Sequence, residues 1–360
     1  MNKRNIFHVD VNSAYLSWEA VNRLQHGSSL DLRTVPSIVG GDEASRHGIV
    51  LAKSIPAKAY KIQTGESLYA ARQKCPNLII VPPHYDLYMQ CHNAMIEILR
   101  EYSPSVQIFS IDECFLDYTN MDSIWGSPIE AAHNLKDRIY KELGFTVNVG
   151  ISTNKLLVKM GGDLKKPDMV HTLFPEEIKN KMWPLPVEDL YGVGRATAPK
   201  LHQLGIYTIG ELANTDPEIL KYKLKSFGQV IWNYANGIED SNVSQGGSPP
   251  IKVIGNSTTI SFDVDNKSDA YKVLLSLTET VGMRLRQAGF CARLVSVSIR
   301  TNEFSHYSHQ RKFSIPTDST TAIYETACKL FDECWKGQPI RHLGVRVSEF
   351  CGNEFIQLSL

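Results

Sequence analysis

The sequence predicts an α+β protein with several domains, and three features support this class. Segments with strand-like alternation are interspersed with segments of helical spacing, starting with an alternating run at residues 5–11. Residues 171–240 then follow a helical pattern with short turns. The stretch 241–250 has the composition of a linker, and strands again alternate with helices after it. The chain has 360 residues, which is enough for two or three domains.

The N-terminal region predicts a split sheet with helices on one face. In its first strand, Phe7, Val9 and Val11 share one face and Asp10 lies on the other. The same patterns predict helices at about 13–24, 87–102 and 129–143, and strands at about 105–111, 113–118 and 147–151. Glycines and prolines punctuate residues 31–75, which predicts a small loop-rich module.

The C-terminal region, residues 252–360, predicts a second and independent α+β domain. Its strands are expected at 253–262, 293–300 and 342–349, and its helices at 268–288 and 318–336.

Composition excludes several classes of protein. The 38 basic residues balance the 38 acidic ones, so total charge gives no sign of nucleic-acid binding. None of the seven cysteines forms a C-x-x-C pair, which argues against a zinc site or a disulfide framework and favours reduced thiols. The N-terminus reaches His8 and Asp10 too early for a signal peptide, and no apolar run approaches the ~18 residues of a membrane span. We therefore expect a cytoplasmic protein without membrane contact.

Three acidic residues lie at strands that a sheet would bring together. Asp10 lies in the first strand, and Asp112 and Glu113 begin another. Converging carboxylates repel each other unless a cation lies between them, and hard oxygen ligands select Mg²⁺ or Mn²⁺. Two such ions stabilise the attacking and leaving oxygens of a phosphoryl displacement. The alternative is that these residues are exposed acids at strand ends.

The surrounding motifs resemble those of Y-family DNA polymerases, the low-fidelity class that copies damaged DNA. The run Ser110–Asp117 (SIDECFLD) resembles their S-I-D-E-x-x-L-D signature, and Asp10–Tyr15 resembles their first motif. Similar matches follow in family order at Val39–Asp42, Val149–Ser152, Asn154–Lys155 and Lys165–Pro167. The ordered set is specific, and it is most similar to bacterial DinB-like (polymerase IV) and UmuC-like enzymes.

The resemblance implies a right-hand polymerase fold with four parts. These are a ferredoxin-like palm at 1–21 and 85–173, small fingers at 22–84, an all-α helix–hairpin–helix thumb at 174–240, and an α+β little finger at 252–360 that binds DNA, after a linker at 241–251.

The resemblance also assigns the acidic residues. Asp10 and Asp112 would bridge two Mg²⁺ ions, for which Mn²⁺ can substitute, and Glu113 would complete the metal site near the primer 3′-OH. The Val11 carbonyl would support the ion bound to the incoming triphosphate. Tyr15, five positions after Asp10, would be the steric gate against a 2′-OH; the alternative is a core aromatic on an amphipathic helix.

Two lysines would contact the triphosphate. Lys166 matches the family's triphosphate lysine, although an isolated Lys-Lys pair is usually a solvated surface feature. Many members have Y-E-A-R where this chain has Ile55–Lys58 (IPAK), so Lys58 would supply a point charge in place of a guanidinium fork. Pro56 stiffens this segment. The departure affects the triphosphate geometry and leaves the metal chemistry unchanged.

Candidate DNA contacts lie in the thumb, the palm and the little finger. Gly192 and Gly194 allow a hairpin backbone to approach a phosphate; the alternative is a helix pair turned by glycines. The further candidates are Lys155, Arg300, Arg311 and Arg341, each of which is otherwise an ordinary surface charge.

The last residues predict a contact with the sliding clamp of replication. Gln357, Leu358 and Leu360 match the bacterial clamp-binding pattern Q-L-x-L-F, and the chain ends where the Phe would stand. This favours a tail beyond Leu360. The alternative is a final edge strand.

The resemblance implies a monomeric DNA-directed DNA polymerase that extends primer–template DNA with deoxynucleoside triphosphates during translesion synthesis. No segment resembles a proofreading exonuclease, so selection would rest on one binding step of about 10–200-fold. Three alternatives stay open: a non-catalytic adaptor of the same family, a helix–hairpin–helix DNA-binding scaffold, and a palm-fold nucleotidyl cyclase.

Overall fold

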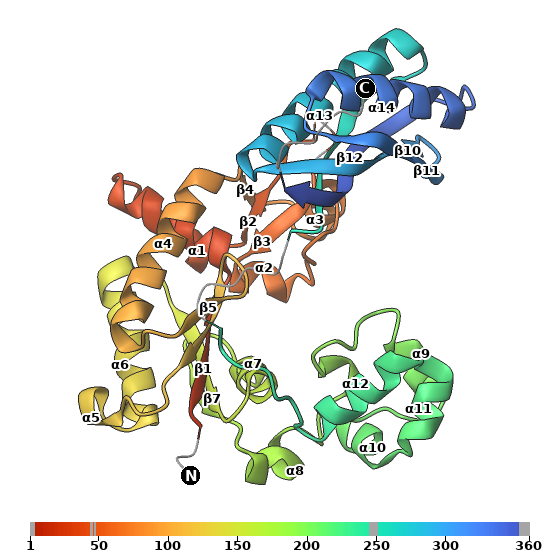
Figure 1. Cartoon of the computed structure of the whole chain (residues 1–360). Helices are drawn as coiled ribbons and strands as arrows, with labels where there is room; N and C mark the ends of the chain where they lie inside the picture. The colour runs from red at the N-terminus through yellow and green to blue at the C-terminus, as the bar shows by residue number, and fades with distance from the viewer. Residues whose placement is uncertain (1–3, 44–45, 47, 245–250, 353–360) are drawn as a thin grey trace. The chain divides into compact units, whose positions relative to one another are not determined.

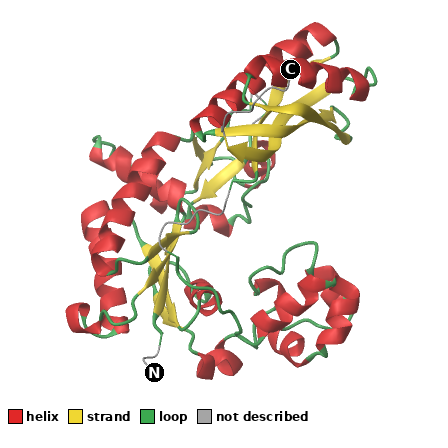
Figure 2. Cartoon of the chain, in the orientation of Figure 1, coloured by secondary structure: helices red, strands yellow, loops and turns green. Residues whose placement is uncertain are grey.

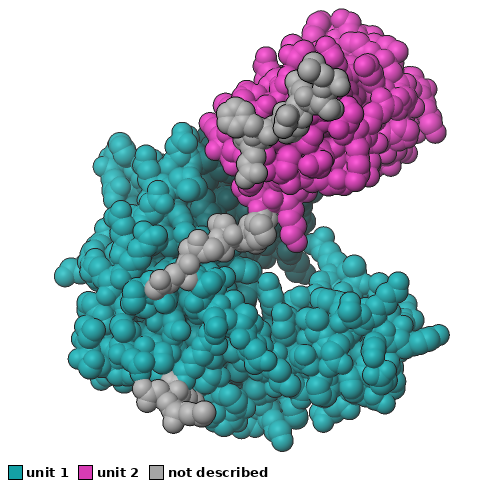
Figure 3. Space-filling model, viewed as in Figure 1, with its two compact units in different colours: residues 1–40, 50–247 teal, residues 41–49, 248–360 magenta. Residues whose placement is uncertain are grey.

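The structure is a computed structural model that describes residues 4–43, 46, 48–244 and 251–352 (Figure 1). Helices and strands are present together throughout most of the chain, which confirms the α+β class (Figure 2). The chain divides into two compact units, residues 1–40 with 50–247 and residues 41–49 with 248–360 (Figure 3). The boundary at 247/248 falls in the expected linker.

A five-stranded sheet is the centre of the first unit, and all of its strands but β8 were expected. Its order is β5 (Val106–Ile108), β6 (Glu113–Asp117), β1 (Ile6–Val11), β7 (Val147–Ser152) and β8 (Val170–Thr172). β1 is antiparallel to both of its neighbours, and β7 is parallel to β8. The central position of β1 places Asp10 directly beside residues of two other strands.

The apolar face of the sheet is covered by helices, as expected. Phe7, Val9 and Val11 pack in one core with residues of α1 (Ala14–Gln25), α4 (Tyr85–Tyr102) and α6 (Pro128–Leu143). Helix α6 begins with a capping box between Ser127 and Glu130 and ends at Gly144, whose φ of 78° suits glycine.

The opposite face is also covered, so the expectation of helices on one face was wrong. Helix α7 (Lys155–Asp163) packs on β7 and β1, and every residue of β1 is buried. This packing requires Gly150, because a Cβ there would lie 1.9 Å from the Val158 carbonyl oxygen. A Cβ at Gly162 would lie 3.3 Å from His8 Nδ1. Glycines in the strand and the helix therefore allow α7 to approach the acidic face of the sheet.

The segment expected to be loop-rich contains a small sheet with its own core. Its order is β3 (Val50–Lys53), β2 (Ser37–Gly40) and β4 (Ile79–Val81), accompanied by α2 (Ile55–Ala59) and α3 (Leu68–Lys74). Ile38, Val50, Ile62 and Leu68 are buried in that core. Pro56 fits the first turn of α2, where a missing N–H costs no helical hydrogen bond.

The sequence predicted a helical pattern over residues 171–240; helices lie within 178–235, while residues 171 and 172 belong to β8. The helices are α8 (Ile178–Lys181), α9 (Ala198–His202), α10 (Ile209–Asn214), α11 (Pro217–Leu224) and α12 (Ser226–Ala235). They share a hydrophobic core with Leu156, Leu157 and Met160 of α7.

The second unit has a four-stranded antiparallel sheet in the order β11 (His306–Thr317), β10 (Phe290–Thr301), β12 (Ile340–Gly352) and β9 (Val253–Val264). Helices α13 (Lys267–Gln287) and α14 (Thr320–Cys334) share its core. The sequence missed β11, because this edge strand is mostly exposed and lacks apolar alternation.

The finer division into palm, fingers, thumb and little finger stays a prediction. No helix in the described ranges combines the length and apolarity needed to cross a membrane.

We expect Gly150→Ala to destabilise the first unit, because the added methyl group collides with the backbone of α7. The melting temperature should fall by about 5–10 °C, as expected for overpacking. Gly194→Ala is the control, since a Cβ there has no neighbour within 4 Å. Equal melting of the two variants would show that α7 does not depend on this close approach.

Candidate active site

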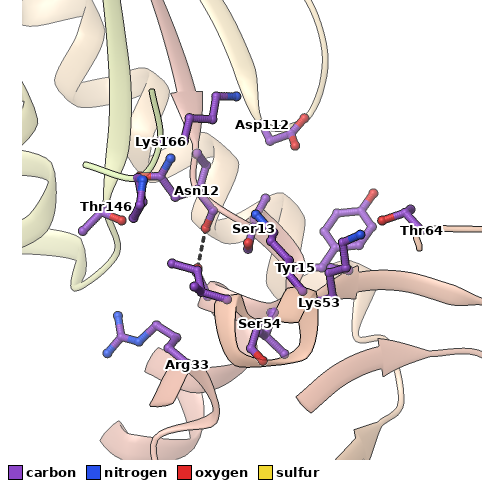
Figure 4. A pocket seen from close by; sticks show the side chains of 18 of the residues that line it. Asn12, Ser13, Tyr15, Arg33, Lys53, Ser54, Thr64, Asp112, Thr146 and Lys166 are labelled. Carbon is purple, nitrogen blue, oxygen red and sulfur yellow. Dashed lines mark hydrogen bonds between the residues drawn. The ribbon is translucent and has the colours of Figure 1, made fainter. Parts of the chain in front are cut away.

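A cavity of about 600 Å³ opens where β1 ends and α1 begins. Figure 4 shows Asp112 and Lys166 at one end of it, with Arg33 and Ser54 at the other. The lining includes Asp10, Val11, Tyr15, Arg33, Lys53, Lys58, Thr64, Asp112, Thr146 and Lys166. Six sequence-predicted residues line this one cavity: Asp10, Val11, Tyr15, Lys58, Asp112 and Lys166.

Asp10 is nearly buried and lies directly opposite Glu113 in the register of β1 and β6. Directly paired residues point to the same face of a sheet, so the two carboxylates are neighbours. Burial raises the pKa of the Asp10 carboxyl, while the positive charge of Lys166 acts in the other direction. The Lys166 ammonium is hydrogen-bonded to Asp10 Oδ2 and lies 2.7 Å from Asp163 Oδ1.

Two buried asparagines hold the turn that carries Lys166. Asn148, on β7, donates to the carbonyls of Gly162 (2.9 Å) and Lys165 (2.7 Å). Asn12 donates to Asn148 Oδ1 (3.1 Å) and accepts from the Asp168 amide (2.9 Å). Sequence analysis missed Asn148, although a polar residue between Val147 and Val149 in a buried strand is the signal that identifies it.

Asp112 reaches the same cavity from the turn before β6. The Ser110 hydroxyl donates to Asp112 Oδ1 at 2.6 Å, and the Val11 amide donates to the Asp112 carbonyl at 3.0 Å. These contacts fix the turn against the end of β1.

Glu113, next to Asp10 on the same face of the sheet, is held by His8 and Lys159. His8 Nε2 lies 3.1 Å and Lys159 Nζ 2.5 Å from the same carboxylate oxygen, Oε2. Burial opposes ionisation, but the hydrogen bonds from His8 and Lys159 outweigh it and lower the pKa of Glu113 to about 2. His8 Nδ1 is buried without a hydrogen-bond partner, so Nε2 is the ring atom that orients this side chain. Sequence analysis did not identify His8 or Lys159 as site residues.

The three carboxylates do not form a ready-made metal cluster. Within the described part of the chain, no group of three or more His, Cys, Asp and Glu side chains is placed to hold a metal ion. Asp10 and Glu113 are instead each paired with a lysine. Carboxylate and carbonyl oxygens are nevertheless the donors that Mg²⁺ prefers. The two paired lysines indicate that these carboxylates need positive charge nearby. The donor set therefore fits a hard divalent cation.

Tyr15 lines the cavity and also packs on the core. Its ring stacks on Tyr88 with the centroids 4.4 Å apart, and it lies near Trp18 and Tyr85. Both interpretations of Tyr15 thus describe part of its environment, since one side of the ring packs on aromatic residues and the side chain borders the cavity.

The cavity carries more positive charge than sequence analysis predicted. Arg33 and Lys53 line it together with Lys58 and Lys166. Arg33 is fixed by Asp31 at 2.9 Å, and Lys53 donates to the Ile62 carbonyl at 2.5 Å. Burial and the nearby charge of Lys58 lower the pKa of Lys53. Neither residue belongs to a motif, so only the tertiary structure identifies them.

Two of the predicted DNA contacts lie shortly before α9, and a third begins α7. Gly192 has a φ of 92°, as a tight hairpin requires, and a Cβ added at Gly194 would meet no atom within 4 Å. Lys155 is the first residue of α7, and its ammonium donates to Gln107 Oε1 and the Asn242 carbonyl.

The predicted arginines of the second unit do not all share one face of its sheet. Arg311 pairs in register with Val295, so it points to the face opposite that of Arg300, and it forms an ion pair with Glu333 at 2.5 Å. Arg341 lies over the Phe304 ring at 5.3 Å. Arg346, which sequence analysis missed, is opposite Ser296 and shares the face of Arg300.

The predicted clamp-binding segment cannot be located in the described part of the chain. Gln357, Leu358 and Leu360 lie outside the described residues, so the contact stays a prediction.

Comparison with known proteins identifies the family. The impB/mucB/samB family matches residues 9–163, its C-terminal domain matches 251–360, and its HHH motif matches 175–206. The chain is 51% identical to DNA polymerase IV of Clostridium acetobutylicum over 99% of this chain and 89% of that protein. It is 39% identical to DNA polymerase IV of Acetivibrio thermocellus over 96% of this chain and 86% of that protein.

A solved structure supports the fold. A Y-family DNA polymerase chimera of Dbh and Dpo4 aligns with a TM-score of 0.81 at 22% identity, covering 97% of this chain and all of the chimera. The family matches, the relatives and the fold agree with the palm motifs on which the resemblance was based. The chain belongs to the impB/mucB/samB family, and within it to the bacterial DinB-like, polymerase IV group of Y-family DNA-directed DNA polymerases.

Proposed function

We propose that this chain extends a primer 3′ end by template-directed, two-metal phosphoryl transfer with low fidelity, and that it does so in the cytoplasm during translesion synthesis. One observation carries the proposal: Asp10 and Asp112 share a cavity with four basic side chains and Tyr15. Acidic residues at one end suit metal ions, and basic residues suit a triphosphate.

The proposed metal is Mg²⁺, within the general dependence of Y-family polymerases on a divalent ion. Asp10, Asp112 and the Val11 carbonyl would hold it, with Glu113 completing the site. When bound, two such ions stabilise charge on the attacking and leaving oxygens of the displacement. Lys166 contacts Asp10 and lines the cavity, so it is placed to exchange that carboxylate for a phosphate oxygen.

The remaining cavity residues bind and select the nucleotide. Arg33, Lys53 and Lys58 would distribute positive charge along the triphosphate, which offsets the missing guanidinium of the usual fingers motif. The Tyr15 ring, stacked on Tyr88, would exclude a 2′-hydroxyl.

Binding of the duplex is assigned to other surfaces. The hairpin at Gly192 and Gly194 would receive a backbone phosphate, while Lys155, Arg300 and Arg346 add charge. Contact with the sliding clamp through Gln357 stays a prediction. A tether of this kind raises the effective concentration of a polymerase at the primer end.

We expect Asp10→Ala, Asp112→Ala and Glu113→Ala each to reduce primer extension by at least about 10³-fold, because each removes a metal ligand. Affinity for primer–template should change little, since other surfaces hold the duplex. Extension is measured on labelled primers and binding by fluorescence anisotropy. Asp122→Ala removes an exposed carboxylate outside the cavity and serves as the control. Near-normal extension by Asp112→Ala would exclude the mechanism.

Tyr15→Ala should raise the ratio of ribonucleotide to deoxynucleotide incorporation by about 10–200-fold, the range that shape discrimination supplies. Tyr15→Phe keeps the ring and should keep the wild-type ratio. The ratio is obtained from kcat/KM for matched ribo- and deoxynucleotides. An unchanged ratio in Tyr15→Ala would mean that the residue serves only the core.

Lys58→Ala and Lys166→Ala should raise the nucleotide KM or lower kcat by about tenfold or more, with little effect on DNA affinity, because each loses a charged contact with the triphosphate. Lys165→Ala is the matched control, since its neighbour Lys166 lines the cavity and Lys165 does not. Single-nucleotide insertion kinetics provide the test. Loss of DNA affinity alone would reassign these lysines to the primer or template.

A further inference from the structure

Lys159 of α7 lies between a carboxylate and two aromatic faces. Its ammonium is 2.5 Å from Glu113 Oε2, 5.2 Å from the centroid of the Phe109 ring and 5.7 Å from that of Tyr191. The side chains of Lys159 and Glu113 are only 14% and 20% exposed, so solvent screens this pair weakly. Three groups that favour a cation therefore meet at one ammonium.

A second cavity lies beside this ammonium. It measures about 170 Å³ and includes Phe109, Phe115, Tyr191 and Tyr234 in its lining, along with Lys155 and Lys159. The ring faces present partial negative charge, and a lysine ammonium is stable against them. Lys159 thus has room to move and a favourable place to occupy without Glu113.

We propose that Lys159 is a positioning residue: it holds the Glu113 carboxylate while no metal ion is bound, and it gives up that carboxylate and stays on the faces of Phe109 and Tyr191, over which it already lies, when a divalent cation is held. Two cations on one carboxylate repel each other strongly in a poorly screened site. The lysine is therefore a tethered competitor of the metal, and the aromatic faces lower the cost of its release. This inference rests on the proposed metal role of Glu113.

Two neighbouring residues, His8 and Lys155, differ from Lys159 in their contacts. His8 also meets Glu113 Oε2, but it is buried and is not among the residues that line the second cavity. Lys155, one helical turn before Lys159, lies 5.8 Å from the centroid of Phe115 and donates to Gln107 and Asn242. Lys155 therefore provides a matched lysine on the same helix that is not paired with a metal carboxylate.

The test is Mn²⁺ binding to the full chain without DNA or nucleotide, measured by the electron paramagnetic resonance of free Mn²⁺. Lys159→Gln should tighten Mn²⁺ binding about tenfold, because the competing cation is removed. Phe109→Leu should weaken it about two- to fivefold, because the released ammonium loses a ring face. Lys159→Arg keeps the charge and should stay near the wild type. Tighter Mn²⁺ binding by Lys159→Gln together with weaker binding by Phe109→Leu distinguishes the proposal from a general change in stability.

Two further variants separate the possible outcomes. Lys155→Gln measures how the removal of any nearby positive charge changes the affinity for Mn²⁺. If Lys159→Gln tightens Mn²⁺ binding no more than Lys155→Gln does, the proposal is wrong. Glu113→Gln tests the metal role itself and should weaken Mn²⁺ binding. If Glu113→Gln weakens binding and Lys159→Gln has no effect, the positioning role alone is wrong. If Glu113→Gln leaves binding unchanged, the proposed metal role and the positioning role are both wrong.

Discussion

The repulsion between Asp10 and Glu113 is the constraint on which the site depends. The antiparallel register of β1 and β6 places these carboxylates directly opposite each other, and both are substantially removed from solvent. Two neighbouring negative charges repel each other, so the ionised pair is unfavourable unless positive charge lies nearby. The fold supplies it from two sides, through Lys166 at Asp10 and Lys159 at Glu113. The same arrangement would suit the two divalent ions of the proposed mechanism.

Close packing of α7 follows from that requirement. A lysine on α7 reaches Glu113 only because the helix backbone approaches β7 within the space that Gly150 leaves open. On the other side, Asn148 and Asn12 bind the turn after α7 and hold Lys166 near Asp10. One helix and its following turn therefore deliver both cations. The sheet is buried on both faces as a consequence, and such packing holds the side chains of a site in a fixed geometry.

The unusual segment Ile55–Lys58 fits a regular helix start. Ser54 caps α2 through the Ala57 amide, and Pro56 occupies the first turn of that helix. Lys58 then reaches the cavity, where Arg33 and Lys53 add charge from neighbouring segments. Positive charge that many Y-family members concentrate in one guanidinium is here distributed over several side chains. A triphosphate, with charge spread over many oxygens, suits that distribution.

Local pattern predicted most of the element types and the α+β class, and the resemblance to Y-family motifs supplied the site residues. The alternation of Phe7, Val9 and Val11 predicted β1, whereas Asp10, Asp112, Tyr15 and Lys166 came from the ordered motifs, and the structure brings them to one cavity. Tertiary structure decided what no local pattern encodes: the second helical layer at Gly150, the exposed edge strand β11, and the partners of each carboxylate. His8 and Lys159 were missed for the same physical reason. Each acts through a contact with a residue distant in the chain, and such pairings are set by strand register and helix packing, to which single-sequence periodicity is blind.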